Sequence, residues 1–468
     1  MPPPTQMFAR AAAYVSGESV RQRELAAGEA GVTLSATTGT EATSLGIAGE
    51  VGVERRGLRS AGRLAYVIGL TRREAGGSDT DETWGLQSIT QGLEASFDGA
   101  LSERTRGMIR SGTFWGVRDS QRLIAGVGLG SGTGTASGTP AEAGPPRGAP
   151  VGTEQRRITR VPYLREDAEV GLLHSTAAGV THQVSFIGSA LVYPDQETVR
   201  VSGERLFETY TAGPQYTLLW RLTPRDTLSG SVDALTTWFS SPSTADPETE
   251  PTENDSVPIE ALSARLGWTR ELSRRWTASG AFGAGWVEPL GEPARSAGGS
   301  GTLLGALGTA WGRGGWALRA DAERAIDQSD VGAVFATTTL RAGARRNLTP
   351  ELIAGLTAAA SRYDVLTQVF SSQADLEGFA ALTPGEAIGQ RALELRARRA
   401  QEGYGLEGTA DLTWQFWGFA GLTLAYAAER RLSDDPNRGD RQVHRGVLGL
   451  TLTSVETQRA SAETLAGD

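Results

Sequence analysis

The chain has 468 residues, a net charge of −9 at pH 7, and 39% hydrophobic residues with a mean hydropathy of −0.26. The acidic net charge argues against a nucleic-acid partner, and the chain has no run of eighteen apolar residues that would form a transmembrane helix. Cysteine is absent, which excludes disulfides and thiolate metal sites. Glycine, at 61 residues, has about twice its usual share, which favours tightly packed, curved sheets.

The first stretch of the chain lacks a strand pattern. Residues 1–27 show no period of two, so we expect an N-terminal tail or a short plug. They also lack a charged segment followed by an apolar one, so an exported form would have lost its signal peptide or would begin upstream. Alternation starts after residue 27, where Gly31–Thr38 and Ser44–Arg55 predict two strands separated by a loop near residue 40.

Segments that alternate apolar and polar residues then follow one another along the chain. They fall at residues 62–72, 84–99, 161–193, 206–222, 227–239, 259–270, 275–288, 315–325, 331–345, 404–416, 418–430 and 445–453. Residues 105–130 hold one long strand or two shorter ones, and residues 131–152 predict a flexible loop rich in glycine and proline. Residues 241–257 form an acidic loop, for which solvation is favoured over cation binding because EF-hand spacing is absent.

The segment Arg275–Glu288 shows the alternation most clearly. One face carries Trp276, Phe282 and Trp286 with small apolar residues between them, and the other face is small or polar. A face about ten residues long with tryptophan at both ends matches a strand that crosses a bilayer with its aromatic rings at the two headgroup layers. This pattern predicts that the apolar face contacts membrane lipid.

The connections between strands alternate in length. Short turns are expected near residues 56, 102, 177, 224, 272, 313, 347 and 417, and long loops near 40, 77, 140, 198, 249, 293, 328, 380 and 436. A meander that closes across a membrane has this property. The predicted fold is therefore all-β: a single closed antiparallel transmembrane β-barrel of about 18 strands, with short periplasmic turns and long extracellular loops. Its parts are a periplasmic tail (1–27), the barrel (28–453) and a C-terminal tail (454–468).

With this alternation and its aromatic girdles, the sequence resembles a porin-sized outer-membrane β-barrel of Gram-negative bacteria over residues 28–453. It is more loosely similar to barrels associated with exopolysaccharide export. The resemblance implies the bacterial outer membrane, contact with its lipids and lipopolysaccharide, and a periplasmic envelope partner. The chain departs from the pattern at its end, because SVETQRASAETLAGD carries no terminal aromatic residue.

Charged residues on the polar faces of the strands are the candidate pore-lining residues. These are Glu50, Arg63, Glu94, Arg221, Asp233, Arg265, Arg319, Asp321, Glu323, Arg341, Arg345, Glu407 and Asp411. One interpretation is a lumen with opposed arginine and carboxylate ladders, whose transverse field filters solutes. The other is that these charges pair across neighbouring strands and hold the barrel together, and mixed signs on adjacent strands favour it.

The longest connection, residues 364–402, contains a segment of helical composition. It carries Arg391, Arg396, Arg398 and Arg399, which would favour anionic solutes if the loop folds into the lumen as a constriction. The alternative is an exposed loop that contacts lipopolysaccharide phosphates. The three histidines, His174, His182 and His444, lie far apart and lack metal-ligand spacing, so we expect no metal site and no cofactor.

The predicted function is a channel that passes a polar solute or a polysaccharide across the outer membrane. The alternative is a closed structural or anchoring barrel in an envelope complex. We expect no enzyme activity, because the sequence shows no cluster of a nucleophile with a base. A soluble array of β-sandwiches is disfavoured, because the tryptophan-edged apolar face would then lack a partner.

Overall fold

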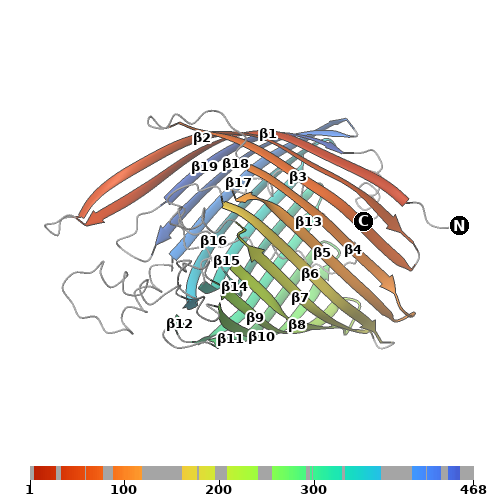
Figure 1. Cartoon of the computed structure of the whole chain (residues 1–468). Helices are drawn as coiled ribbons and strands as arrows, with labels where there is room; N and C mark the ends of the chain where they lie inside the picture. The colour runs from red at the N-terminus through yellow and green to blue at the C-terminus, as the bar shows by residue number, and fades with distance from the viewer. Residues whose placement is uncertain are drawn as a thin grey trace, which may run out of the picture.

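Period-two alternation produces strands, and in the computed structural model these strands join into one closed antiparallel sheet (Figure 1). The structure describes residues 5–27, 33–57, 59–76, 88–118, 161–176, 179–194, 208–240, 256–290, 296–297, 299–328, 333–369, 403–417, 419–433 and 441–453. None of these residues belongs to a helix long and apolar enough to cross a membrane.

The strands pair in the order of the sequence, and β1 pairs with both β2 and β19, which closes the barrel. Their bounds are β1 Thr5–Ala27, β2 Thr33–Arg56, β3 Ser60–Gly76, β4 Ser88–Ala100, β5 Thr105–Arg118, β6 Val161–Ser175, β7 Val180–Val192, β8 Glu208–Arg221, β9 Asp226–Ser240, β10 Ser256–Ser273, β11 Trp276–Pro289, β12 Ser296–Ala297, β13 Ser300–Arg313, β14 Trp316–Gln328, β15 Ala333–Asn347, β16 Leu352–Val369, β17 Gly403–Trp417, β18 Ala420–Ser433 and β19 Arg441–Thr453.

Connection lengths alternate as predicted along most of the chain, but the long loop expected near residue 328 is short, because β14 ends at Gln328 and β15 begins at Ala333. Apart from the two-residue β12, the described residues form 18 strands, and every second connection between them is a short turn. The tightest turns suit their residues: Gly314 and Gly315 join β13 to β14 with φ of 58° and 81°, the left-handed region that glycine adopts without strain. Both ends of the described chain, Thr5 and Thr453, lie at the short-turn end. The predicted closed antiparallel barrel is confirmed.

The prediction of a tail over residues 1–27 is wrong for most of that segment, because residues 5–27 form β1. The pattern was hidden because the outward face of β1 is largely alanine and glycine (Ala9, Ala11, Ala13), while the lumen face carries Phe8 and Tyr14. The two strands expected within residues 31–55 are one strand, β2, which pairs with β1 through the polar stretch that had suggested a loop near residue 40. One strand was missed at residues 5–27 and one strand was predicted as two within residues 31–55, so the predicted number of strands is unchanged. Residues 454–468 lie outside the described residues.

A belt of large apolar side chains covers the outward face. Phe282 is 70% exposed and Leu303 is 77% exposed, and Phe282 alternates with small residues that face the lumen. Outward aromatic residues lie near both ends of the strands: Trp220, Trp268, Trp276, Trp316 and Trp414 near the short turns, and Trp115, Tyr210, Trp286 and Tyr404 near the long loops. An exposed apolar surface with two aromatic girdles is the surface of a barrel that spans a bilayer.

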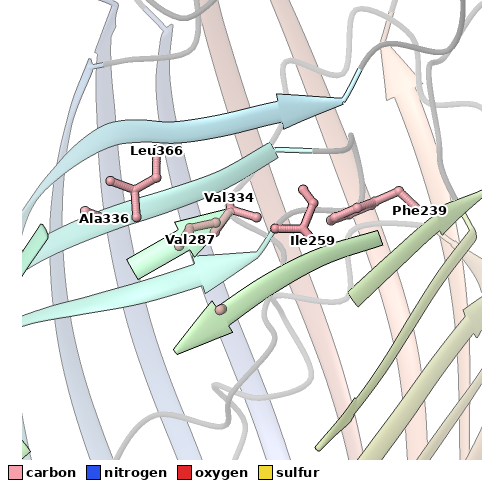
Figure 2. Packing of buried hydrophobic residues seen from close by; sticks show 7 residues of the cluster. Phe239, Ile259, Val287, Val334, Ala336 and Leu366 are labelled. Carbon is pink, nitrogen blue, oxygen red and sulfur yellow. The ribbon is translucent and has the colours of Figure 1, made fainter. Parts of the chain in front are cut away.

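The largest buried apolar cluster lies inside the barrel at the long-loop end. It joins lumen-facing residues of β9–β11 (Phe239, Ile259, Val287) with Val334 of β15 and Leu366 of β16 (Figure 2). These strands are not neighbours in the sheet, so the cluster exists only because part of the sheet overlaps itself. The ladder between β13 and β14 ends at the pair Gly305–Arg324, although both strands continue beyond it.

Candidate functional site: the lumen wall

Successive side chains of a strand point to opposite faces of the sheet. Side chains at positions that alternate with the outward apolar residues of the same strand therefore face the lumen, and we call these positions the lumen parity. All thirteen charged residues proposed from the sequence lie on that parity. Arg221 is the last residue of β8, is exposed, and donates to the carbonyl of Pro224 at 3.3 Å, which places it at the short-turn rim. The other twelve lie along the wall, and the contacts of all but Glu94 on β4 divide them into three groups.

The first group is a buried cluster on β1, β2 and β3. Glu50 is only 5% exposed and contacts the Arg63 guanidinium on one side, while Arg10 Nη1 lies 3.6 Å from Glu50 Oε2 on the other. The Arg63 guanidinium also lies over the Phe8 ring, 5.0 Å from its centroid. Arg10 was missed from the sequence because it lies in the segment expected to be a tail. We call Arg10, Glu50 and Arg63 the β1–β3 cluster, and its geometry is that of a structural ion pair.

Glycines on β2 allow aromatic rings to lie flat beside this cluster. A Cβ built on Gly46 would lie 2.0 Å from Tyr14 Cζ, and one built on Gly52 would lie 2.5 Å from Phe8 Cζ. Glu50 lies between these two glycines on the same face of β2. The Phe8 ring, two positions along this face from Glu50, therefore covers one side of the cluster, and the Tyr14 ring covers Gly46 four positions away on the other side.

A second group crosses the wall from β10 to β14. Arg265 Nη1 lies 3.2 Å from Glu323 Oε1, although β11 and β13 lie between their strands. The lumen-facing residues below this pair are small, Gly283 and Ala306 among them. A contact of this reach forms on the concave side of a curved sheet, so Arg265 and Glu323 lie on the concave face. Beside it, Ser263 Oγ donates to Asp233 Oδ2 at 2.8 Å, and on β14 Arg319 pairs with Asp321 at 3.0 Å.

The third group contains charges that face each other without pairing. Arg341 and Arg345 lie on β15, and Glu407 and Asp411 lie on β17, with β16 between them. The register aligns Arg341 with Ala359 and Glu407, and aligns Arg345 with Gly355 and Asp411. None of the four makes an ion pair with a residue in the described part of the chain. We call these four residues the open quartet.

The floor of the open quartet is made of small residues of β16. Two strand spacings separate the arginine row from the carboxylate row, which is about 10 Å between backbones. A Cβ on Gly355 would lie 2.3 Å from Asp411 Oδ1, so the carboxylate lies directly over this glycine. Arg345 and Glu407 are exposed, and Arg341 and Asp411 are half-buried. The arrangement presents opposite charges to water on the two sides of a shallow strip.

The ends of β14, β15 and β16 form a second layer inside the wall, which we call the inner flap (residues 324–328, 333–339 and 361–369). A Cβ on Gly285 of β11 would lie 2.4 Å from Ile326 Cδ1, so Ile326 covers the lumen face of β11. Ser300 Oγ of β13 donates to the carbonyl of Leu366 at 2.8 Å, and β12 pairs with the last residues of β16. The inner flap therefore narrows the long-loop half of the lumen.

A polar clasp holds the base of the inner flap. Arg324 Nη1 lies 2.8 Å from Asp364 Oδ2 and donates to Thr338 Oγ1 at 2.6 Å, while its Nε donates to Thr302 Oγ1 on β13 at 3.2 Å. Asp364 also accepts from Arg362 Nε at 2.9 Å. Arg324 thus joins the wall to the flap at the residue where the β13–β14 ladder ends. Neither Arg324 nor Asp364 was predicted as a lumen residue, because each lies at a position in phase with the membrane-facing residues of its strand.

The histidines face outward, away from the lumen. His182 Nδ1 lies 2.8 Å from the Tyr216 hydroxyl, and His444 Nδ1 lies 2.7 Å from the Tyr426 hydroxyl. His174 Nδ1 lies 3.0 Å from Thr105 Oγ1. No group of potential metal ligands occurs among the described residues. The proposed constriction residues Arg391, Arg396, Arg398 and Arg399 and most of the acidic loop lie outside the described residues.

Comparisons with known proteins assign no family to this chain. No protein-family model matches the chain, and no curated protein matches it. The FrpB iron transporter from Neisseria meningitidis, in its apoprotein form, gives a TM-score of 0.48 at 10% identity over 90% of this chain. OccK5 from Pseudomonas aeruginosa gives 0.42 at 12% identity over 95% of this chain and 98% of its own. The outer membrane protein OprD from Pseudomonas aeruginosa gives 0.41 at 11% identity, with 95% and 94% covered.

This chain spans 62% of the length of that FrpB chain. The three TM-scores lie below 0.5, so this likeness carries no conclusion about the chain. It assigns no substrate to this chain, and it does not show the similarity to exopolysaccharide-export barrels that the sequence suggested.

Proposed function

We propose that this protein is a channel of the bacterial outer membrane that passes small polar solutes, and that the open quartet is part of the solute path. The observation that carries the proposal is the water exposure of lumen charges that have no ion-pair partner in the described chain. A barrel of 16–18 strands is wide enough to leave an aqueous channel. The apolar outward belt supplies the surface that a membrane protein needs.

The open quartet favours solutes that carry both charges. A solute that lies along β16 has the guanidinium groups of Arg341 and Arg345 on one side and the carboxylates of Glu407 and Asp411 on the other. Each side offers attraction to one sign of charge and repulsion to the other. A zwitterion oriented across the strip gains from both rows, whereas a simple anion or cation gains from one and loses to the other.

Conductance of the refolded protein in planar bilayers tests the proposal. We expect steady openings, and we expect the double variant R341Q/R345Q to lower the anion-to-cation permeability ratio about twofold to fivefold, because a nearby unit charge in water is worth about 1 kcal/mol. The variant E407Q/D411N is expected to raise it by a similar factor. R225Q, in the exposed β8–β9 turn, is the matched control and leaves the ratio unchanged. Unchanged ratios in both double variants would contradict the role of the quartet.

A second candidate is the closed anchoring barrel, and the inner flap favours it because its apolar interface fills part of the lumen. Insertion into the bilayer without conductance, in the wild type and in all variants, would support this candidate over a channel.

A further inference from the structure

The apolar residues of the inner flap have a second possible environment. Ile326, Val334 and Ala336 continue the parity that faces outward lower in the same strands, where Leu318 and Leu340 are 41% and 56% exposed. If these strand ends lay in the wall, the same side chains would face the membrane. The sequence of the flap is therefore compatible with a position in the lumen and with a position in the wall.

The inner wall, in contrast, is adapted to the flap in its present position. The wall face covered by the flap is apolar at Phe239, Ile259 and Val287, each at most 1% exposed. From the edge of the flap toward the short turns, that face carries Asp233, Ser263 and Arg265 instead. Apolar residues on the lumen face of these strands are thus concentrated where the flap packs (Figure 2). We call the arrangement with the flap packed inside the lumen the tucked state, and these matching apolar surfaces make it a specific state.

The tucked position also leaves interactions unmade. Asp233 Oδ1 and Thr337 Oγ1 are buried without a hydrogen-bond partner among the described residues. Asp233 is aligned with Ser263 and Gly285, and Gly285 lies under Ile326. In addition, β13 beyond Gly305 and β14 beyond Arg324 make no ladder with each other. Orphaned polar groups and an interrupted ladder disfavour this state, which brings the two positions closer in free energy.

We propose that the inner flap is a gate: its strand ends leave the lumen and extend the β13–β14 ladder, which widens the long-loop half of the channel. This inference rests on the proposed channel function. Continuing the register from Gly305–Arg324 aligns Leu303 with Ile326 in the open state. In the tucked state these two residues lie on opposite sides of the wall, since Leu303 is 77% exposed on the outward face and Ile326 covers Gly285. The two states are bistable arrangements of one element.

Engineered disulfides test the gate, because the chain has no cysteine of its own. The pair G285C/I326C links the flap to the inner wall and locks the tucked state. The pair L303C/I326C forms a disulfide only in the extended ladder and locks the open state. The pair A284C/L303C joins register partners of β11 and β13 and serves as the control for oxidation and folding.

We expect oxidation of G285C/I326C to lower the conductance and a reductant to restore it. We expect L303C/I326C to crosslink and to raise the conductance, and A284C/L303C to crosslink without effect. Failure of L303C/I326C to crosslink while the control does so would overturn the gate. So would an oxidised G285C/I326C with wild-type conductance. A protein that never conducts refutes the proposed channel, and the crosslink of L303C/I326C still decides whether the flap moves.

Discussion

The β1–β3 cluster and the open quartet use the same residue types on the same face of one sheet, yet only the first is paired. Glu50 is 5% exposed and lies between two arginines, whereas Glu407 is exposed and pairs with no described residue. The difference comes from the neighbouring side chains. Phe8 packs on a glycine two positions from Glu50 and covers one side of the cluster, and β16 offers no ring beside Glu407 at Ala359.

This contrast shows what decides the role of a lumen charge. A carboxylate removed from water requires a partner, because an unpaired buried charge is costly. A carboxylate that stays in water loses little by remaining unpaired, because exposed ion pairs contribute little. Burial, more than charge pattern, therefore separates the charges that hold this barrel together from those that face a solute.

Removing one carboxylate from each region tests most directly whether burial decides the contribution of a lumen charge to stability. Glu50→Ala leaves Arg10 and Arg63 without their counter-charge, and we expect a loss of about 3–5 kcal/mol of unfolding free energy. Glu407→Ala removes an exposed charge, and we expect a change within about 0.5 kcal/mol. Urea unfolding in lipid vesicles measures both. Equal losses of unfolding free energy in the two variants would show that the β1–β3 cluster stabilises the barrel no more than the open quartet does.

The next largest effect is expected where the wall is apolar instead of charged. Phe239→Ala removes a ring that is fully buried between the wall and the flap, and we expect it to weaken the tucked state by about 3 kcal/mol. The rate of crosslinking in the L303C/I326C background reports the change. Phe282→Ala is the matched control, because this ring is 70% exposed on the outward face and does not touch the cluster. Similar crosslinking rates in the two variants would show that the apolar cluster does not hold the flap in the tucked state.

The fold was predictable where outward and lumen faces contrast strongly, and the errors lie where they do not. Arg275–Glu288 alternates large and small residues, and β11 follows it closely. In β1, alanines face outward and Phe8 and Tyr14 face inward, so hydrophobicity no longer marks the membrane side. The polar middle of β2 suggested a loop because a strand that extends beyond the bilayer needs no apolar face there.

The lumen parity of the charged residues was predictable from period two, but their contacts were not. Pairing depends on the register between strands, which a single sequence does not give. Arg265 with Glu323 is the clearest case, because the two lie on strands that are not adjacent. The inner flap was hidden for another reason: Ile326 and Val334 keep the membrane-facing parity while they pack inside the barrel.

The smallest predicted effect concerns the clasp. The Asp364 side chain is 29% exposed, so replacing it with asparagine removes its partly hydrated ion pairs with Arg324 and Arg362, which together are worth about 1 kcal/mol. We expect Asp364→Asn to speed crosslinking of L303C/I326C about fivefold, well below the effect of Phe239→Ala. Asp321→Asn, which removes a pair with Arg319 on the wall portion of β14, is the control.

The ratio of these two effects identifies what holds the flap. If Asp364→Asn accelerates crosslinking more than Phe239→Ala does, the clasp controls the gate and the apolar cluster only fills space. If the order is as expected, the apolar cluster sets the resting position. Arg324 then acts at the base of the flap, where the β13–β14 ladder ends, and the cost of breaking its contacts determines how far the ladder extends.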